Sequence, residues 1–297
     1  MALAIVFALS WLIQFVIQLA LWQRPLRHAR KLQRQAVINP DSAAQQPGVS
    51  ILVHSRNAGE SLARNIPLLM SQDYPQFEVI VLDDDSLDET QDVVTMLEQR
   101  YDNFYHTRID KRTRAMSHRK LGVLLGAKAS HYDLLVMTHA ECKPESDKWL
   151  AEMVRPFANP AIEVVQGPVV YERRQSLLSR FCQFDLFQRL LMLLGITLAV
   201  RPYAGWGQNM AFRKRTFYAN GSQGYQTHLN IQPGEDDLFV ANVGHDGNVA
   251  VQCAAASVMT DQSKPLFINW SLQLLDRAFT SRLYAFAPTL VKWTDYV

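Results

Sequence analysis

Apolar runs and helical patterns alternate along the first part of the chain. Val49 to Val53 is an apolar run that stops at the polar residues His54 to Asn57. A helical pattern follows over residues 60–71, and a second apolar run, Val79 to Leu82, ends in three aspartates. A strand, a helix and another strand in this order predict a βαβ unit with a right-handed crossover.

The same alternation continues towards the C-terminus. The spacing of the apolar positions predicts further helices and strands, and Asp88 is placed to cap the first of these helices. The predicted helices cover residues 88–100, 121–129, 149–157, 176–200 and 265–286, and the predicted strands cover residues 103–108, 132–137 and 162–166. Strands that alternate with helices indicate an α/β fold.

The N-terminal stretch from Ala2 to Trp22 carries no charged side chain, and about 20 such residues span a bilayer as a helix. Gln14 and Gln18 lie on one face, so a buried amphipathic helix is the alternative. A cleaved signal peptide fits poorly, because no basic residue precedes the apolar run and no A-x-A site closes it. Basic residues follow at once and favour an anchor with a cytoplasmic flank: they are Arg24, Arg27, His28, Arg30, Lys31 and Arg34.

Four segments follow from this pattern. We expect a transmembrane anchor over residues 1–23 and a basic juxtamembrane segment with a proline-containing linker over residues 24–47. The globular domain would cover residues 48–260, and a helical segment that is a candidate for membrane association would cover residues 261–297. Within the globular domain, Leu190 to Val200 is too short to cross a bilayer. A core helix is therefore expected there, with a helix on the membrane surface as the alternative.

Composition excludes several classes of function. The net charge of +2 is nearly balanced and argues against a nucleic-acid partner. Cys142, Cys182 and Cys253 are widely spaced and form no CxxC pair, which favours a reducing compartment. No G-x-G-x-x-G follows the first strand and no G-x-x-x-x-G-K-[ST] occurs, which argues against a nicotinamide-dependent oxidoreductase and a P-loop hydrolase.

Polar side chains follow the predicted parallel strands where ligands bind in such sheets. His54 and Asp83 to Asp85 would share one crevice, where carboxylates suit ribose hydroxyls, base N–H groups or a metal bound to phosphates. The strand over residues 132–137 runs into His139 and Glu141, whose side chains fall on one face of an extended segment. The alternative is a strand terminus whose His and Glu merely face solvent.

These segments resemble the family 2 glycosyltransferases, which have the GT-A fold. V-S-I-L-V-H-S-R-N matches the first strand of that family, and L-D-D-D-S-L-D-E-T resembles its V-D-D-x-S-x-D-x-T loop. P-Y-A-G-W-G-Q-N-M-A-F with the following R-K resembles its G-x-G-x-N-x-A-x-R-K block, and G-E-D-D-L-F resembles its E-D motif. The resemblance covers residues 48–270 and implies a Rossmann-like mixed, mostly parallel sheet flanked by helices, here behind an N-terminal transmembrane helix.

The resemblance implies a site for a nucleotide-sugar donor. Asp84 would read the nucleobase or ribose with help from His54 and Asp83, and Lys120, the basic residue that opens a helix, would face the donor. The basic residues around it would form a cationic rim for a diphosphate, or else are a solvated basic turn. They are Arg108, Lys111, Arg112, Arg114, His118, Arg119 and Lys120.

The family carries D-x-D where this chain has His139-Ala140-Glu141. The resemblance implies a divalent metal, Mn²⁺ or Mg²⁺, that Glu141 and His139 would hold against the diphosphate. An imidazole ligand suits softer metals and disfavours Mg²⁺. The departure from D-x-D leaves a second hypothesis, a catalytically impaired protein that keeps the GT-A fold and binds nucleotides as a scaffold.

The two later motifs imply the acceptor side. Asp236 would be the general base, with Asp237 as the alternative in register, and Glu235 would orient or bind the acceptor. The glycine block would lie beside the acceptor through Gly205, Trp206 and Asn209, with the Trp206 ring stacking on a sugar face. The structural alternatives are a glycine-rich turn around a buried Trp and carboxylates that only complement a helix dipole.

The predicted function is an inverting glycosyltransferase that moves a sugar from a nucleotide sugar, most simply a UDP-sugar. The acceptor would be a saccharide or lipid-linked molecule at the cytoplasmic face of the cell (inner) membrane, in polysaccharide biosynthesis. Processive members of the family carry Q-x-x-R-W, which is missing around Gln273. Polymer-threading synthesis is therefore not expected.

Overall fold

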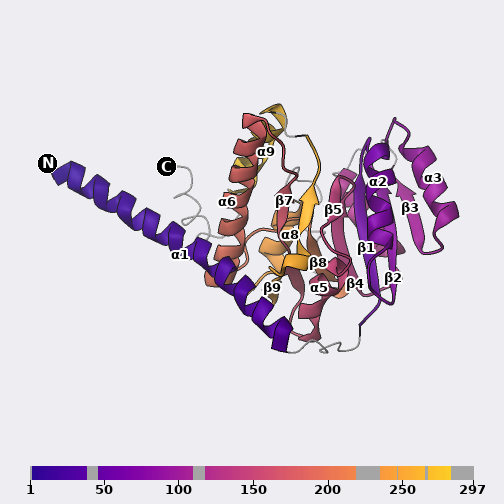
Figure 1. The fold of residues 1–297 in the computed structure, drawn as a ribbon, viewed down its shortest axis with the longest axis horizontal. Coiled ribbons are helices and arrows are strands. Elements are labelled where there is room, and N and C mark those ends of the chain that lie inside the picture. The colour runs from indigo at the N-terminus through magenta and orange to yellow at the C-terminus, as the bar shows by residue number, and fades with distance from the viewer. Residues whose placement is uncertain are drawn as a thin grey trace.

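The computed structural model describes residues 2–38, 46–109, 118–218, 235–245, 247–264 and 267–281. They contain a mixed seven-stranded sheet in the order β3-β2-β1-β4-β8-β6-β9 and a three-stranded sheet in the order β5-β10-β7 (Figure 1). The large sheet comprises β1 (Val49–Ser55), β2 (Phe77–Asp83), β3 (Phe104–Arg108), β4 (Leu134–His139), β6 (Val164–Gln166), β8 (Met210–Arg213) and β9 (Val249–Val251). The small sheet comprises β5 (Cys142–Pro144), β7 (Val169–Tyr171) and β10 (Met259–Asp261).

The first four strands are parallel, and β8 lies antiparallel between β4 and β6. This confirms the predicted α/β fold with a mostly parallel sheet. Strand β4 ends two residues later than predicted, because His139 pairs with His54 in the ladder between β1 and β4. The predicted helix over residues 149–157 ends at Val154 and continues as a 3₁₀ turn, in which Pro156 cannot donate a helical hydrogen bond.

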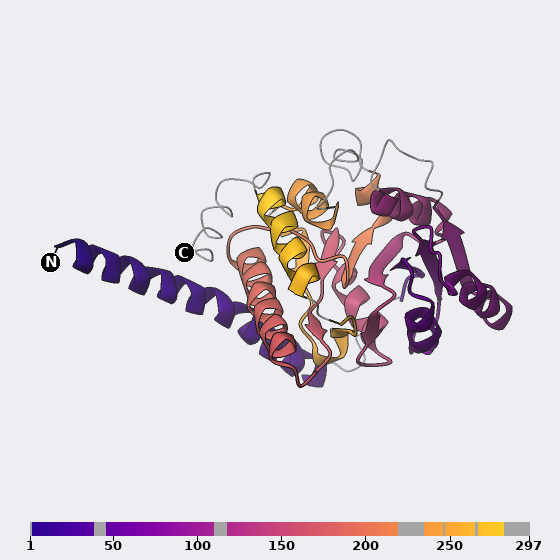
Figure 2. The same ribbon diagram turned by 90° about the horizontal axis from the view of Figure 1, so that it is seen from above.

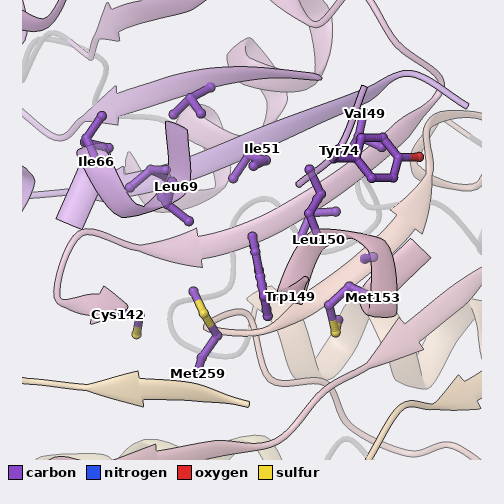
Figure 3. Packing of buried hydrophobic residues seen from close by; sticks show 14 of the residues in the cluster. Val49, Ile51, Ile66, Leu69, Tyr74, Cys142, Trp149, Leu150, Met153 and Met259 are labelled. Atoms are coloured by element: carbon purple, nitrogen blue, oxygen red, sulfur yellow. The ribbon is translucent and has the colours of Figure 1, made fainter. Parts of the chain in front are cut away.

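Alternate residues of each central strand enter different cores. Ile51 and Val53 pack into the core that contains α2 (Gly59–Met70), α3 (Thr90–Arg100) and α5 (Trp149–Val154). Leu52 packs into the opposite core with α4 (His118–Ala129) and α8 (Glu235–Val243). Figure 3 shows part of the first core, to which Ile51, Leu69 and Trp149 all belong. Because both faces are covered, the strands are apolar throughout and their polar residues gather at the ends.

The N-terminal helix α1 (Ala2–Ile38) is 37 residues long and continues through Pro25. The predicted limit of the anchor at residue 23 is therefore not a break in the helix. Near Leu21 it packs on α6 (Leu177–Ala199) at Gly195, where an added Cβ would lie 2.5 Å from the Leu21 carbonyl oxygen. Its N-terminal part projects from the globular part in both views (Figures 1 and 2). Large apolar residues there are exposed: Ile5, Phe7, Leu9, Trp11, Leu12, Ile13, Phe15, Val16, Ile17 and Leu19.

Among the described residues, one helix is long and apolar enough to cross a membrane, and that helix is α6. Its buried residues include all of 190–196, which agrees with the predicted core helix in its C-terminal part. The membrane anchor at α1 stays a prediction. Helix α9 (Phe267–Ser281) lies beside α6 (Figure 2), and Trp270 Nε1 donates to Asp185 Oδ2 at 2.9 Å. Residues 39–45 of the predicted linker lie outside the described residues, and so do residues 265–266 and 282–286 of the predicted last helix.

Candidate active site

Three neighbouring strands bring their polar ends together at one edge of the sheet. In the ladders, Ser55 of β1 pairs with Asp83 of β2, and His54 of β1 pairs with His139 of β4. The rings of the two histidines have centroids 5.7 Å apart. The backbone N–H of Ala140 donates to the carbonyl of His54 at 2.9 Å and turns the chain away after β4. His54 therefore lies beside His139, whereas Asp83 pairs with Ser55 and points to the other face of the sheet, because successive strand residues alternate. The crevice shared by His54 and the aspartates stays a prediction.

The two predicted donor aspartates differ in their contacts. Asp83 is 1 % exposed, and its Oδ1 accepts hydrogen bonds from the backbone N–H and hydroxyl of Ser86 at 3.2 and 2.5 Å. Its carboxylate thus holds the loop after β2 in shape. Asp84 forms an ion pair with Arg56 at 3.4 Å. Asp85 adopts a φ of 48° and pairs with Arg108 at 3.0 Å, so the loop after β2 turns sharply between two cations.

The start of α4 brings a basic residue to this edge. Arg119 is exposed, and its charge acts on His54, His139 and Glu141. Lys120, the predicted donor-facing residue, is 1 % exposed and lies inside the fold. Consecutive helical residues point about 100° apart, so the two side chains cannot serve the same face. The two residues therefore have different surroundings, and the donor-facing role of Lys120 stays a prediction. Residues 110–117 of the basic cluster lie outside the described residues.

Burial keeps the two histidines uncharged at neutral pH. Desolvation, followed by the charges of Arg119 and Arg56, lowers the pKa of His54 to about 3. Desolvation and Arg119 also lower the pKa of His139 well below its ordinary value. The Nε2 atom of His54 is buried and has no hydrogen-bond partner among the described residues. A neutral imidazole has a nitrogen lone pair that can accept a hydrogen bond or coordinate a cation. Both rings are therefore in the protonation state that such binding requires.

Glu141 meets a second carboxylate that the motifs did not indicate. Burial is the largest cause that raises the pKa of Glu141, and the negative charge of Asp261 raises it further. Asp261 ends β10 and pairs with Cys142 of β5, which places it beside Glu141. It belongs to none of the family blocks used above. Asp261 could have been found in the sequence as a carboxylate that ends a short apolar strand, which is how Asp83 was identified.

The glycine block contacts the predicted base directly. The backbone N–H of Gly207 donates to Asp236 Oδ2 at 3.0 Å. A Cβ on Gly207 would lie 2.1 Å from that oxygen, and a Cβ on Gly205 would lie 2.7 Å from the carbonyl oxygen of Asp236. A side chain at either position would collide with Asp236 at the start of α8, so both positions require glycine. Because Thr138 Oγ1 donates to the carbonyl of Gln208 at 3.0 Å, the same loop joins Asp236 to the end of β4.

The remaining predicted acceptor residues have different surroundings. The side-chain amide of Asn209 is fully buried: Nδ2 donates to the carbonyls of Pro168 and Ser257, and Oδ1 accepts from Trp149 Nε1. The structure thus gives the Asn209 amide an internal role, since both of its N–H donors are used and its side chain is fully buried. Trp206 is half-buried, and so is Asp237. Glu235 is the first residue of α8, and its side chain lies outside the described residues.

The predicted ligands of the metal, Glu141 and His139, both lie in the part of the chain that the structure describes. No group of three His, Cys, Asp or Glu side chains able to hold an ion occurs in the described ranges. Glu141 and the neutral imidazole of His139 still fit a site that the diphosphate of a substrate completes, because hard divalent cations in nucleotide sites take few protein ligands and several phosphate oxygens. Burial and the charge of Asp261 raise the pKa of Glu141 and thus disfavour its ionised form, which a bound cation would stabilise.

Two solved protein structures are similar to this chain in fold. The chain is similar in fold to the mannosyltransferase PcManGT from Pyrobaculum calidifontis, solved with GDP-Man and Mn²⁺, with a TM-score of 0.62, 18 % identity, and coverage of 95 % of this chain and 79 % of that chain. It is also similar to S. aureus TarS 1-349 in complex with UDP-GlcNAc, with a TM-score of 0.53, 14 % identity, and coverage of 74 % and 59 %. At these identities the likeness shows the fold alone.

Two sequence comparisons agree with the fold. Glycosyltransferase AglE of Haloferax volcanii is 25 % identical over 127 residues, which span 42 % of this chain and only 40 % of that protein. The sequence model of glycosyl transferase family 21 matches residues 3–259. The predicted GT-A glycosyltransferase is thereby confirmed, although the motifs above were compared with family 2. From its sequence match over most of its length, the chain belongs to glycosyl transferase family 21.

Proposed function

We propose that this glycosyltransferase moves a sugar, with inversion, from a nucleotide-sugar donor to a saccharide or lipid-linked acceptor at the cytoplasmic face of a membrane. The observation that carries the proposal is the hydrogen bond from Gly207 to Asp236. Since the next residue, Gln208, is bonded to Thr138, this contact holds a carboxylate near the end of β4. Proteins of similar fold were solved with GDP-Man and with UDP-GlcNAc. They support a nucleotide-sugar donor, with a UDP-sugar as the first choice.

The donor would bind between the loop after β2 and the start of α4. Asp84, beside Arg56, is suited to accept hydrogen bonds from ribose hydroxyls or base N–H groups. The guanidinium of Arg119 would meet the diphosphate and offset the negative charge that grows as it leaves. A divalent metal held by Glu141 and His139 would supply additional Lewis-acid charge to the same leaving group.

The acceptor would react on the opposite face of the sugar. Asp236 takes the proton of the acceptor hydroxyl while that oxygen forms a bond to the anomeric carbon. The bond from the anomeric carbon to the diphosphate oxygen breaks, and the diphosphate keeps the electron pair. This single displacement needs no enzyme nucleophile and inverts the anomeric centre. The N–H of Gly207 fixes the direction of the Asp236 carboxylate before the acceptor arrives.

A membrane location is supported by the exposed apolar residues of α1 and by the basic residues that follow them on the same helix. Large apolar side chains on the neighbouring helices α6 and α9 are exposed as well: they are Leu177, Phe181, Phe184, Phe187, Phe267, Ile268, Leu272 and Leu275. Exposed apolar surface of this extent is unusual in a soluble monomer and marks contact with a membrane or a partner.

A carbonate-wash flotation assay tests the anchor. The full chain is expected to float with phosphatidylglycerol vesicles and to resist alkaline carbonate, because its apolar helix enters the bilayer. Ile13→Lys with Val16→Lys should release the protein, since each charge disfavours insertion by about 3 kcal/mol. Leu68→Lys, at an exposed apolar position of α2, is the matched control. Release of the unmodified chain by carbonate would support an amphipathic helix instead.

The rival function is a nucleotide-binding scaffold without turnover. It is favoured by one observation, the replacement of both aspartates of D-x-D by His139 and Glu141. A scaffold would bind nucleotides and release no product, whereas an enzyme would release a nucleoside diphosphate from its donor. The two hypotheses therefore differ in one measurable quantity.

A panel of UDP- and GDP-sugars with Mn²⁺ or Mg²⁺ tests the proposed function. We expect divalent-dependent release of nucleoside diphosphate in the presence of a saccharide or lipid acceptor, with Mn²⁺ more effective than Mg²⁺ because an imidazole ligand favours the softer ion. His139→Asp should shift the preference towards Mg²⁺. Saturable nucleotide binding with no turnover under any condition would contradict the enzyme and support the scaffold.

A further inference from the structure

Trp206, Gln208 and Asp261 form a chain of hydrogen bonds that joins two distant parts of the sequence. Trp206 Nε1 donates to Gln208 Oε1 at 2.6 Å, and Gln208 Nε2 donates to Asp261 Oδ2 at 2.7 Å. The other carboxylate oxygen of Asp261 accepts the backbone N–H of Ser263 at 2.8 Å. Asp261 is 4 % exposed, so both of its oxygens are held in a buried and defined geometry.

The chemistry of the three groups allows a single direction for this chain. An indole nitrogen can only donate, and an ionised carboxylate can only accept. The amide of Gln208 lies between them, so its NH₂ must face Asp261 and its oxygen must face Trp206. Asp261 therefore determines the orientation of the Gln208 amide. That orientation places the amide oxygen of Gln208 where it accepts the N–H of the Trp206 indole.

The loop that carries Trp206 also contacts the proposed base. Gly207, the next residue, donates to Asp236, and the carbonyl of Gln208 accepts from Thr138 at the end of β4. The backbone on the C-terminal side of the Trp206 ring is thus fixed by these two bonds, and its side chain is fixed by Gln208. A ring held in this way beside Asp236 is suited to orient a sugar, because an aromatic face combines apolar area with a defined plane.

We propose that Asp261 is a positioning residue for glycosyl transfer, which acts through Gln208 to hold the Trp206 ring in the orientation that meets the sugar. This role rests on the proposed function, in which Trp206 stacks on a sugar. Asp261 itself touches neither the sugar nor the reacting atoms. Asp261 orders the Trp206 ring before the sugar binds. Less conformational entropy is then lost when the sugar binds.

Inverting the polarity of the chain tests this proposal. In Asp261→Asn, the backbone N–H of Ser263 still needs an acceptor and therefore holds the amide oxygen at position 261. The NH₂ group at position 261 then faces Gln208. The Gln208 amide then turns, and its NH₂ meets the Trp206 N–H, donor to donor. Gln208→Glu places two carboxylates against each other. In the double variant D261N/Q208E, the new carboxylate at position 208 accepts from both neighbours, which restores the chain with the same net charge.

The first readout needs no substrate. The chain has six tryptophans, and indole ¹H–¹⁵N spectra with Trp206→Phe identify the Trp206 signal. Its N–H is expected to be protected from solvent exchange in the unmodified chain, to lose this protection in each single variant and to regain it in D261N/Q208E. Asp102→Asn, at an exposed position before β3, should leave the signal unchanged.

The second readout is steady-state kinetics. Each single variant should raise KM for the sugar-bearing substrate about threefold to tenfold, the effect of one lost hydrogen bond, with a smaller change in kcat. D261N/Q208E should recover most of the loss. Because D261N/Q208E returns a negative charge to this site, recovery of KM alone does not separate positioning from charge. The exchange protection of the Trp206 N–H makes that separation, since it reports the hydrogen bond itself.

Two results would overturn the positioning role while the proposed function stands. One is a Trp206 signal that stays protected in both single variants. The other is loss of protection with KM unchanged, or with no recovery in the double variant. Absence of transfer by the unmodified chain on every donor would overturn the proposed function and the role of Asp261 with it, even if the spectra follow the expected pattern.

Discussion

Asp236→Asn is expected to lower kcat by about 100-fold to 10,000-fold, the usual contribution of a positioned general base. The amide keeps the size of the carboxylate and can still accept the Gly207 N–H, so the fold should be unaffected. What it loses is the capacity to take the proton from the acceptor hydroxyl. The measurement is the rate of glycosyl transfer at saturating donor and acceptor, with circular dichroism to verify folding.

Asp237→Asn is the matched control, because Asp237 was the alternative base in the same motif. The hydrogen bond from Gly207 reaches Asp236, and we therefore expect Asp237→Asn to retain more activity. A companion variant, Gly207→Ala, would place a Cβ 2.1 Å from Asp236 Oδ2 and force the carboxylate to move. It should lower kcat without removing any chemical group. Equal activity of Asp236→Asn and the unmodified chain would refute the base assignment.

Stability should depend on pH through His54. In metal-free buffer containing a chelator, lowering the pH from 7.5 to 5 should decrease the free energy of unfolding by about 2 kcal/mol through this residue alone. The pKa of His54 is 6.5 in its ordinary state and about 3 in the fold. Between these values the unfolded chain binds a proton that the folded chain excludes, so the unfolded state gains as the pH falls.

Urea unfolding at several pH values measures this effect. His54→Asn removes the titrating group, and its stability should fall less than that of the unmodified chain over the same window. His139, whose pKa is also lowered, acts in the same direction and remains in the variant. His245→Asn, at an exposed position outside this cluster, is the control. Parallel stability curves for His54→Asn and the unmodified chain would show that the imidazole is not protected from protonation.

The sheet and its helices could be predicted well because their signal is local. Apolar runs marked the first strands, and the helical spacing marked α2, α3 and α4 to within a few residues. These patterns survive because each strand is buried on both faces and each helix on one. The ends were less accurate. His139 joins β4 because His54 offers a partner across the ladder, and that partner is far away in the sequence.

The assignment of individual site residues was limited by side-chain direction. Lys120 and Arg119 are neighbours in a basic cluster, and only the packing of α4 against the sheet decides which is buried and which acts on the histidines. Asn209 belongs to a motif that suggested an acceptor contact, yet its amide is used by Pro168, Ser257 and Trp149. A motif identifies a segment, but internal hydrogen bonds decide which of its side chains remain available.

By itself, the amino-acid sequence determined the class of fold, the edge of the sheet where polar residues collect and the resemblance to glycosyltransferases, because these depend on local periodicity and short motifs. Tertiary structure alone decided that Gly207 meets Asp236 and that Asp261 lies beside Glu141 and orients Gln208. The physical reason is that such contacts join strands and helices that are remote in the chain. Only the pairing of β10 with β5 and the packing of α8 against the glycine block bring them within hydrogen-bond distance.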